Sequence, residues 1–148
     1  MAETLGSLLD KLTIVKLKQW HSEDPLAQES LLKQESQLQA EVTEFIGAAV
    51  AGEIPLERLT FKAHKVYKKE GNQVVEVSGT IGSVFSQLSD VNCRLWHEQE
   101  KVYEFHTVAP EKKDQVVKNL AILNLERNKC IDAIDREFQS LVVKAKQA

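Results

Sequence analysis

Apolar residues recur at helical spacing along most of the chain, in four segments separated by sharp breaks. Within each segment the apolar positions follow a period of about 3.6 residues, which is typical of an amphipathic helix. The segments span residues 4–21, 25–50, 80–100 and 110–143. Their start signals are Thr4, Asp24 with Pro25, Thr80 and Pro110. Because the joint between the first two segments is short, they are predicted to form an antiparallel hairpin.

The apolar faces of these four segments are predicted to form one core. Its expected members are Leu5, Leu8, Leu9, Leu12, Val15 and Trp20, then Leu31, Leu38, Val42, Phe45, Ile46 and Ala49, then Ile81, Val84, Phe85, Leu88, Val91 and Trp96, and finally Val117, Leu120, Leu123, Ile131, Ile134, Phe138 and Leu141. Both Trp residues are included because Trp at helical spacing with Leu and Val is usually a core residue.

The chain also repeats itself, because residues 5–24 and 81–100 align without a gap. The identical pairs are Gly6/Gly82, Ser7/Ser83, Leu12/Leu88, Val15/Val91, Trp20/Trp96 and His21/His97. Such self-similarity predicts one supersecondary unit used twice and packed on its copy. We therefore expect an all-α four-helix bundle built from two duplicated hairpins related by a pseudo-twofold axis. The single domain, 1–148, would comprise repeat A (about 4–52), a connector (53–79) and repeat B (about 80–146).

The connector has a pattern of its own. Residues 65–77 place a polar Gly-Asn centre between β-branched and aromatic residues, which suggests a short β-hairpin. A plain loop is the alternative, since an isolated two-stranded hairpin is marginally stable.

Composition restricts the class of protein. The chain is 43% hydrophobic and 28% charged, with a formal net charge of −3, as in ordinary soluble domains. Its cations are scattered among acids, so we expect no nucleic-acid partner, and no apolar run predicts membrane insertion. No secretion signal is visible, and Cys93 and Cys130 match no metal-binding spacing. We expect a cytoplasmic protein whose two cysteines are reduced and buried.

The repeated Trp-His pairs are candidates for a metal site. His21 and Asp24 lie three residues apart, as do His97 and Glu100, and residues at that spacing share a helix face. A twofold axis would bring two imidazoles and two carboxylates together, a ligand set suited to zinc, iron or manganese. Packing and capping are the favoured interpretation, because Asp24 suits the cap of the next helix. No cofactor is predicted, and a divalent metal is the alternative.

Polar residues within apolar stripes form a second candidate site. Arg127 lies midway between Leu123 and Ile131, and Asn92 midway between Leu88 and Trp96. Lys16 is the counterpart of Asn92 in the first repeat. Buried polar groups need partners, and by helical phase the candidates near Arg127 are Glu35 and Asn124. The group predicts either a ligand pocket in which Arg127 holds an anion or a structural network that sets helix register.

Three stretches resemble a bacterial family of small uncharacterised helical proteins. The matching positions are Gly6, Leu8, Leu9, Asp10, Lys11, Leu12, Thr13 and Ile14, then Asn92, Leu95 and Trp96, and then Asn124, Arg127 and Asn128. The chain departs from the family pattern after Trp96, where His97 and Gln99 interrupt the acids. The resemblance adds Asp10 to the candidate ligand-binding residues. It implies no reaction, but it suggests an accessory role beside glycosyltransferases in surface-polysaccharide biosynthesis.

No common catalytic motif is present, so we expect a non-catalytic binding or assembly module. The expected partner is a second copy or another protein. A homodimer is plausible because the last helix outruns its counterpart and would offer apolar surface to a second copy. The rival hypothesis is an enzyme or sensor with a central polar pocket, working with or without a bound metal. Its residues would be His21, His97, Asp10, Asn92 and Arg127.

Overall fold

The computed structural model describes residues 3–61 and 76–148. Within these ranges the chain forms four α-helices, two 3₁₀ turns and no strand, so the expected all-α class is confirmed. The elements are α1 (Leu5–His21), α2 (Pro25–Val50), η1 (Leu56–Arg58), α3 (Ile81–Tyr103), η2 (Phe105–Thr107) and α4 (Pro110–Gln147). The predicted β-hairpin over 65–77 lies outside the described residues, except for Glu76 and Val77.

Local capping explains why the helix starts were predictable. Thr4 and Ser7 form a reciprocal box, in which the Ser7 amide donates to Thr4 Oγ1 at 3.2 Å and the Thr4 amide donates to Ser7 Oγ at 2.8 Å. Asp24 Oδ1 accepts from the Leu26 amide at 3.0 Å, and Thr80 Oγ1 accepts from the Ser83 amide at 3.2 Å. Each such cap stabilises its helix by about 1 kcal/mol.

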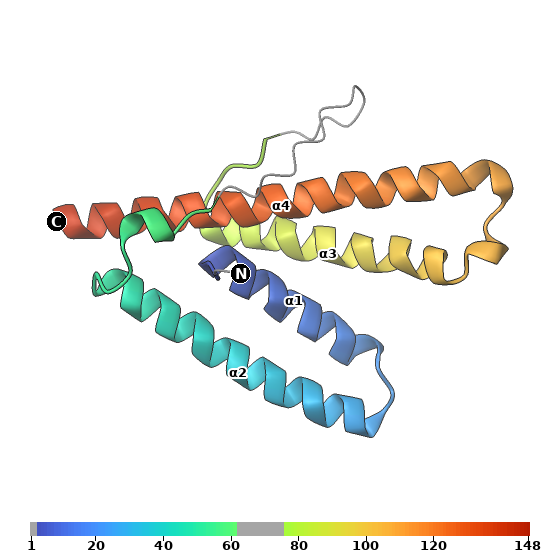
Figure 1. Ribbon diagram of the computed structural model, residues 1–148, viewed down its shortest axis with the longest axis horizontal. Helices are drawn as coiled ribbons and strands as arrows, with labels where there is room; N and C mark the ends of the chain where they lie inside the picture. The colour runs from blue at the N-terminus through green and yellow to red at the C-terminus, as the bar shows by residue number, and fades with distance from the viewer. Residues whose placement is uncertain (1–2, 62–75) are drawn as a thin grey trace.

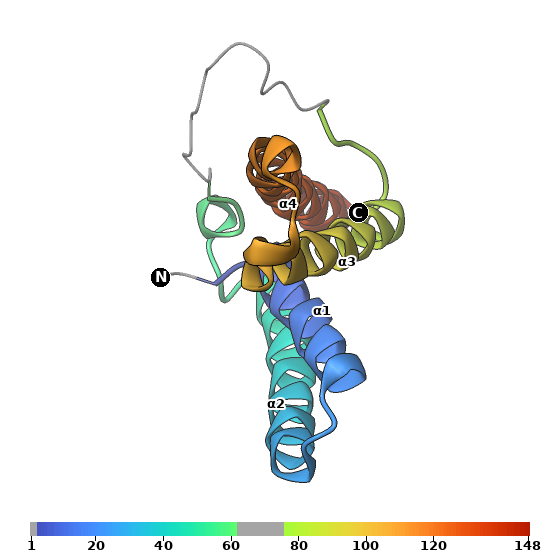
Figure 2. The same cartoon turned by 90° about the vertical axis from the view of Figure 1, so that its right-hand side faces the viewer.

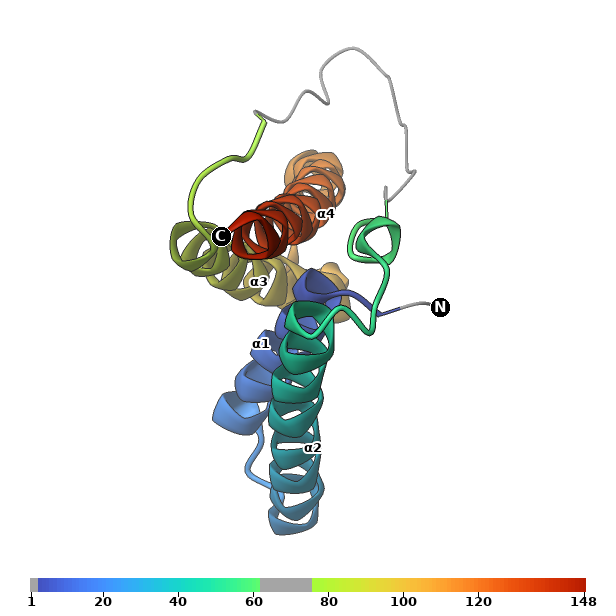
Figure 3. The ribbon, with the colours of Figure 1, turned by 90° about the vertical axis from the view of Figure 1, so that its left-hand side faces the viewer.

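The four helices make a bundle of two antiparallel hairpins, and the hairpins splay apart (Figure 1). α3 and α4 pack along each other, whereas the α1–α2 hairpin leans away so that its turn points away from them (Figures 1 and 2). α1 lies between α2 and the α3–α4 hairpin, and it contacts the other three helices. α2 is the outermost helix, packed mainly on α1 (Figure 3).

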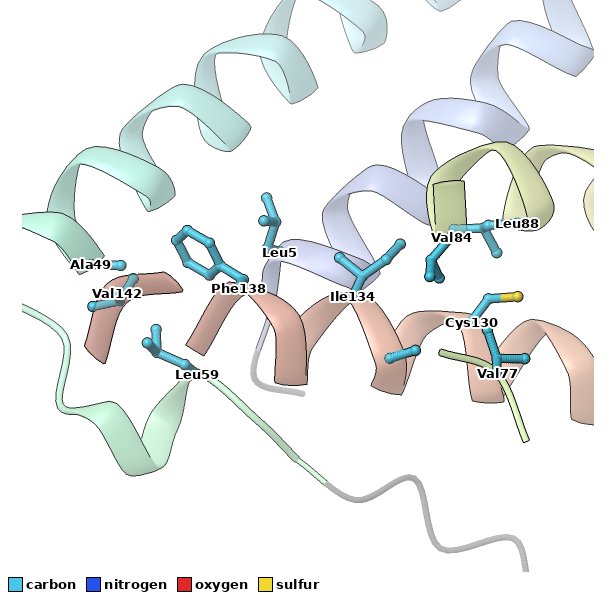
Figure 4. Packing of buried hydrophobic residues seen from close by; sticks show 11 residues of the cluster. Leu5, Ala49, Leu59, Val77, Val84, Leu88, Cys130, Ile134, Phe138 and Val142 are labelled. Atoms are coloured by element: carbon cyan, nitrogen blue, oxygen red, sulfur yellow. The ribbon is translucent and has the colours of Figure 1, made fainter. Parts of the chain in front are cut away.

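The core lies where α1, α3 and α4 meet and extends under the connector (Figure 4). Its buried members are Leu5, Ala49, Leu59, Val77, Val84, Leu88, Cys130, Ala133, Ile134, Phe138 and Val142. Leu59 and Val77 come from the connector, which is anchored on α4 by a hydrogen bond from Gln139 Nε2 to the Leu56 carbonyl at 2.8 Å. The described parts of the connector, residues 53–61 and 76–79, therefore contribute to the folded core.

Several burial predictions were wrong. Trp20 is 84% exposed, because at the end of α1 it is the next residue, His21, that turns toward α3 and stacks on Trp96. On α4, Leu123, Ile134 and Phe138 are buried as predicted. Val117 and Leu141, near the two ends of the predicted stripe, are exposed, and their neighbours Val116 and Val142 are buried instead. Cys130 is buried as expected, but Cys93 is exposed, and both are free thiols.

The packing does not follow the predicted twofold symmetry. α1 packs on α4, but the equivalent contact between α3 and α2 is almost absent. Gly6 touches α4 so closely that a Cβ there would lie 2.5 Å from the Ile131 carbonyl oxygen, whereas Gly82 has no heavy atom within 4 Å of such a Cβ. The two sequence copies therefore have different surroundings, and one face of α2 is left without a helix neighbour.

Candidate functional site

Asp10 is the centre of a buried polar cluster that joins three helices. Its side chain lies on α1, and the residue is 3% exposed. Oδ1 accepts hydrogen bonds from Asn92 Nδ2 on α3 at 3.0 Å and from Arg127 Nε on α4 at 2.8 Å, and Oδ2 accepts from Arg127 Nη2. The paired bonds from Arg127 form the fork-shaped geometry that gives guanidinium–carboxylate pairs their strength.

Thr13 completes this polar cluster of Asp10, Thr13, Asn92 and Arg127. Asn92 Nδ2 donates to Thr13 Oγ1 at 2.7 Å, and that hydroxyl donates to the Asp10 carbonyl at 2.7 Å. Asn92 is 1% exposed, and its Oδ1 has no hydrogen-bond partner among the described residues. The sequence pattern missed Thr13, although its position three residues after Asp10 places both on one helix face.

The electrostatics of the cluster favour an ion pair. Hydrogen bonding to Asp10 raises the pKa of the Arg127 guanidinium, an effect that burial opposes. The Asp10 side chain is almost fully buried, so removing Arg127 would leave a desolvated carboxylate without its countercharge. The cluster therefore locks α1, α3 and α4 into one register.

One side of Arg127 borders a cleft of about 360 Å³ between α1 and α2. Its polar lining includes Lys11 and Lys18 from α1 and Gln34 and Gln37 from α2. The Arg127 side chain is 34% exposed there, whereas Asp10 lies behind it. The lining also includes the carboxylates of Asp10 and Glu41, so a ligand in this cleft would meet groups of both charges.

The structure brings Asp10, Asn92 and Arg127 together and leaves the other two candidate ligand-binding residues outside. Lys16 is exposed and pairs with Glu35 Oε1 at 3.1 Å, and Asn124 is exposed on α4. Glu35, a candidate partner of Arg127 by helical phase, instead accepts hydrogen bonds from Lys16 and Gln19 on α1. Hydrogen bonds from Gln19 and then Lys16 lower the pKa of Glu35.

The residues of the metal hypothesis have other contacts. The His21 ring stacks on Trp96, with centroids 4.7 Å apart and planes 11° apart, and Asp24 caps α2. Glu100 Oε1 accepts from Trp96 Nε1 at 2.8 Å, and Glu100 Oε2 lies 3.9 Å from His97 Nδ1. Within residues 3–61 and 76–148, no three His, Cys, Asp or Glu side chains are grouped as metal ligands would be.

Asp135 is a second buried carboxylate, and the sequence pattern did not single it out. It lies on α4, and its Oδ1 accepts the Gly6 amide at 2.7 Å. Burial raises the pKa of Asp135 to about 6, and the hydrogen bonds from Gly6 and Thr4 oppose that rise. The carboxylate thus binds the Gly6 N–H and the Thr4 side chain at the start of α1, where a negative charge also meets the positive end of the helix dipole.

Comparison of the chain with protein-family models, curated proteins and solved structures finds no match. The resemblance to a bacterial helical family stays a prediction from the motifs. Among the helices of the described ranges, none is both long enough and apolar enough to cross a membrane.

Proposed function

We propose that this chain is a cytoplasmic, non-catalytic assembly module that associates with a second copy of itself through the α1–α2 hairpin. The observation that carries the proposal is the exposure of α2. Only Leu31 and Ala49 of its 26 residues are buried, although the helix is rich in apolar side chains. In a closed four-helix bundle each helix has neighbours on two sides, and α2 has one along most of its length.

The exposed apolar residues lie on the hairpin itself. Leu32 is 60% exposed, Val50 is 56% exposed, and Trp20 stands at the edge of a groove that also reaches Phe85 on α3. Exposed apolar surface of this kind marks protein contact sites. The expected interface at the end of α4 is less favourable, because Val142 there is already buried by the core.

The polar cluster supports a binding role over catalysis. Asp10 and Asn92 are buried and bonded to other helices, so their side chains set the packing of the hairpins. The motif resemblance supports an accessory role beside glycosyltransferases in surface-polysaccharide biosynthesis.

Sedimentation equilibrium of the wild type and of two matched variants tests the proposal. Leu32→Lys puts a charge on the exposed face of α2, and Val117→Lys puts the same charge at a similarly exposed position on α4. We expect the wild type and Val117→Lys to be dimeric, and Leu32→Lys to dissociate at least tenfold more readily, because an unpaired cation would be desolvated. A monomeric wild type, or equal effects of the two variants, would contradict the proposal.

Ligand binding in the cleft beside Arg127 is a second candidate function, favoured by the exposed part of that guanidinium. Melting temperatures measured with divalent ions, nucleotides and nucleotide sugars test it, since a ligand that binds the folded state raises the midpoint. A shift lost in Lys18→Gln and retained in Lys33→Gln, a lysine outside the cleft, would support this function. No shift with any of these compounds would count against it.

A further inference from the structure

The cleft beside Arg127 contains one spare charge of each sign. Lys18 of α1 and Glu41 of α2 both line it, and within residues 3–61 and 76–148 neither side chain forms an ion pair. The other ionisable groups of the lining are already neutralised, because Arg127 pairs with the buried carboxylate of the polar cluster and Lys11 pairs with Glu3. A ligand in the cleft therefore meets one unpaired ammonium group and one unpaired carboxylate.

The two spare charges lie toward opposite ends of the cleft. Lys18 and Gln34 also border a hollow on the side of the turn between α1 and α2, whereas Lys11 and Glu41 border another toward the start of α1. Seven residues separate Gln34 from Glu41, which corresponds to about 10 Å along the helix. A single ligand that pairs with both charges must carry an anionic and a cationic group at about this separation.

Hydrogen-bonding groups line the cleft between these charges. Two of the five N–H groups of Arg127 bond the buried carboxylate, so the others are available on the exposed part of the side chain. The amide groups of Gln34 and Gln37 donate to Ser30 and Glu41, and their oxygens accept no hydrogen bond from the described residues. The apolar part of the lining comprises Ile14, Val15 and Leu38. Donors and acceptors for a peptide bond are thus present beside an apolar surface.

We infer that the cleft beside Arg127 binds a short peptide with free termini. The terminal carboxylate pairs with Lys18, the terminal ammonium pairs with Glu41, and a peptide carbonyl accepts from Arg127. An extended chain advances about 3.3–3.6 Å per residue, so a tripeptide spans about 10 Å and reaches both charges. This inference rests on the second candidate function, ligand binding in this cleft, and it names the class of ligand.

Other classes of small molecule fit the charges less well. A nucleotide or a nucleotide sugar supplies only anionic groups beside its neutral parts, so it would bring more negative charge close to Glu41 and leave that carboxylate unpaired. A single α-amino acid carries both charges, but one carbon atom separates them, which is too short for this cleft. The volume of about 360 Å³ lies at the small end of the range for ligand sites, as a tripeptide requires.

Isothermal titration calorimetry with blocked and unblocked peptides tests the inference. The probe is glycyl-leucyl-glycine, whose central side chain suits the apolar part of the lining. Its N-acetylated form lacks the ammonium group, and its C-amidated form lacks the carboxylate. We expect the unblocked peptide to bind, and each blocked form to bind at least threefold more weakly, because each loses one ion pair at a partly exposed site.

Protein variants assign each terminus to its partner. Lys18→Gln should weaken the unblocked peptide at least threefold and have no further effect on the C-amidated form. Glu41→Gln should do the same for the unblocked peptide and have no further effect on the N-acetylated form. Lys33→Gln and Glu29→Gln are the matched controls, because these two residues pair with each other outside the cleft. Neither control should change the binding of any peptide.

The outcomes separate this inference from the function on which it rests. Peptide binding that survives unchanged in both Lys18→Gln and Glu41→Gln would place the peptide elsewhere and overturn the inference. A nucleotide or nucleotide sugar that binds in a Lys18-dependent manner, with no binding of the peptide, would overturn the inference and leave ligand binding in the cleft intact. No binding of the peptide or of any compound in the melting assay would overturn both.

Discussion

The amide of Gly6 donates a hydrogen bond to the carboxylate of Asp135 at 2.7 Å, across 129 residues of sequence. This contact joins the first turn of α1 to the middle of α4, and it requires that nothing separates the two backbones. Glycine provides the space, because a Cβ at position 6 would lie 2.5 Å from the Ile131 carbonyl oxygen and 2.8 Å from Asp135 Oδ1. The docking of the two hairpins depends on this close approach.

The first prediction follows from the two repeats. Gly6→Ala forces α1 away from α4, so we expect a loss of about 2–3 kcal/mol in the free energy of unfolding. Gly82→Ala is the matched control from the second repeat, where the added methyl has no neighbour within 4 Å. Better helix propensity should stabilise that variant by up to about 1 kcal/mol. Urea unfolding of both variants checks the difference, and equal effects would show that the docking tolerates a methyl.

The second prediction concerns pH. The pKa of Asp135 is raised from 3.8 to about 6, so the folded state holds the proton more tightly than the unfolded state. Its stabilising contribution is therefore complete below pH 3.8 and is lost as the pH rises through about 6. Over about two pKa units this amounts to roughly 3 kcal/mol.

Asp135→Asn tests this sign. Asparagine keeps an oxygen for the Gly6 amide and removes the titrating charge, so the variant should melt higher than the wild type at pH 8. At pH 4 the two should melt at similar temperatures. Asp114→Asn, at an exposed position of α4, is the control and should change neither value. An Asp135→Asn variant less stable than the wild type at pH 8 would refute the prediction.

The third prediction separates structure from ligand binding in the polar cluster. Arg127→Leu leaves the Asp10 carboxylate buried without its cation, so we expect a loss of about 3 kcal/mol in unfolding free energy. In an Asp10→Asn background the same substitution should cost about 1 kcal/mol, because no buried charge is left unpaired. A double-mutant cycle by chemical denaturation measures this coupling. Additive effects would mean that the ion pair does not hold the helices together.

The fourth prediction concerns the stacked rings at the end of α1. His21→Ala removes the ring that covers Trp96, so the indole should become more exposed and its fluorescence emission should shift to the red. Trp20→Phe gives a background in which Trp96 is the only tryptophan. Loss of the stack should lower the unfolding free energy by about 0.5–1.5 kcal/mol. His97→Ala is the control, because that ring is exposed and takes no part in the stack.

Features that depend on neighbouring residues were predictable from the sequence, and features that depend on distant contacts were not. The start of α1 followed from Thr4, and that of α2 from Asp24, because a cap acts within one turn. Gly6 and Gly82 each lie in a Thr-x-Gly-Ser sequence at a helix start, yet only Gly6 closely approaches the backbone of another helix. The splay of the hairpins, and with it the exposure of Trp20, is decided by such nonlocal contacts.

In the candidate site, too, local features were predictable from the sequence and nonlocal contacts were not. Helical phase marked Arg127 and Asn92 as polar residues on apolar faces, and both lie in the cluster. Phase could not identify the carboxylate, because the angle between the hairpins determines whether Asp10 or Glu35 reaches Arg127. The sequence did not identify Asp135, because its partner is the Gly6 backbone amide and the side-chain pattern does not reveal backbone partners.

The fifth prediction concerns polar residues on the face of α2 that is proposed to meet a second copy. Gln39 and Thr43 are exposed and lie seven and eleven residues after Leu32, so they share its helix face. Because burying a polar side chain in a protein contact is unfavourable, replacing both with leucine should tighten the dimer. We expect the combined variant Gln39→Leu with Thr43→Leu to lower the dimer dissociation constant at least tenfold in sedimentation equilibrium. Gln37→Leu changes an exposed position of α2 away from that face, and it should leave the constant unchanged. If Gln37→Leu tightened the dimer as much as the combined variant, added hydrophobicity anywhere on α2 would explain the gain, and the face of Leu32 would not be the contact surface.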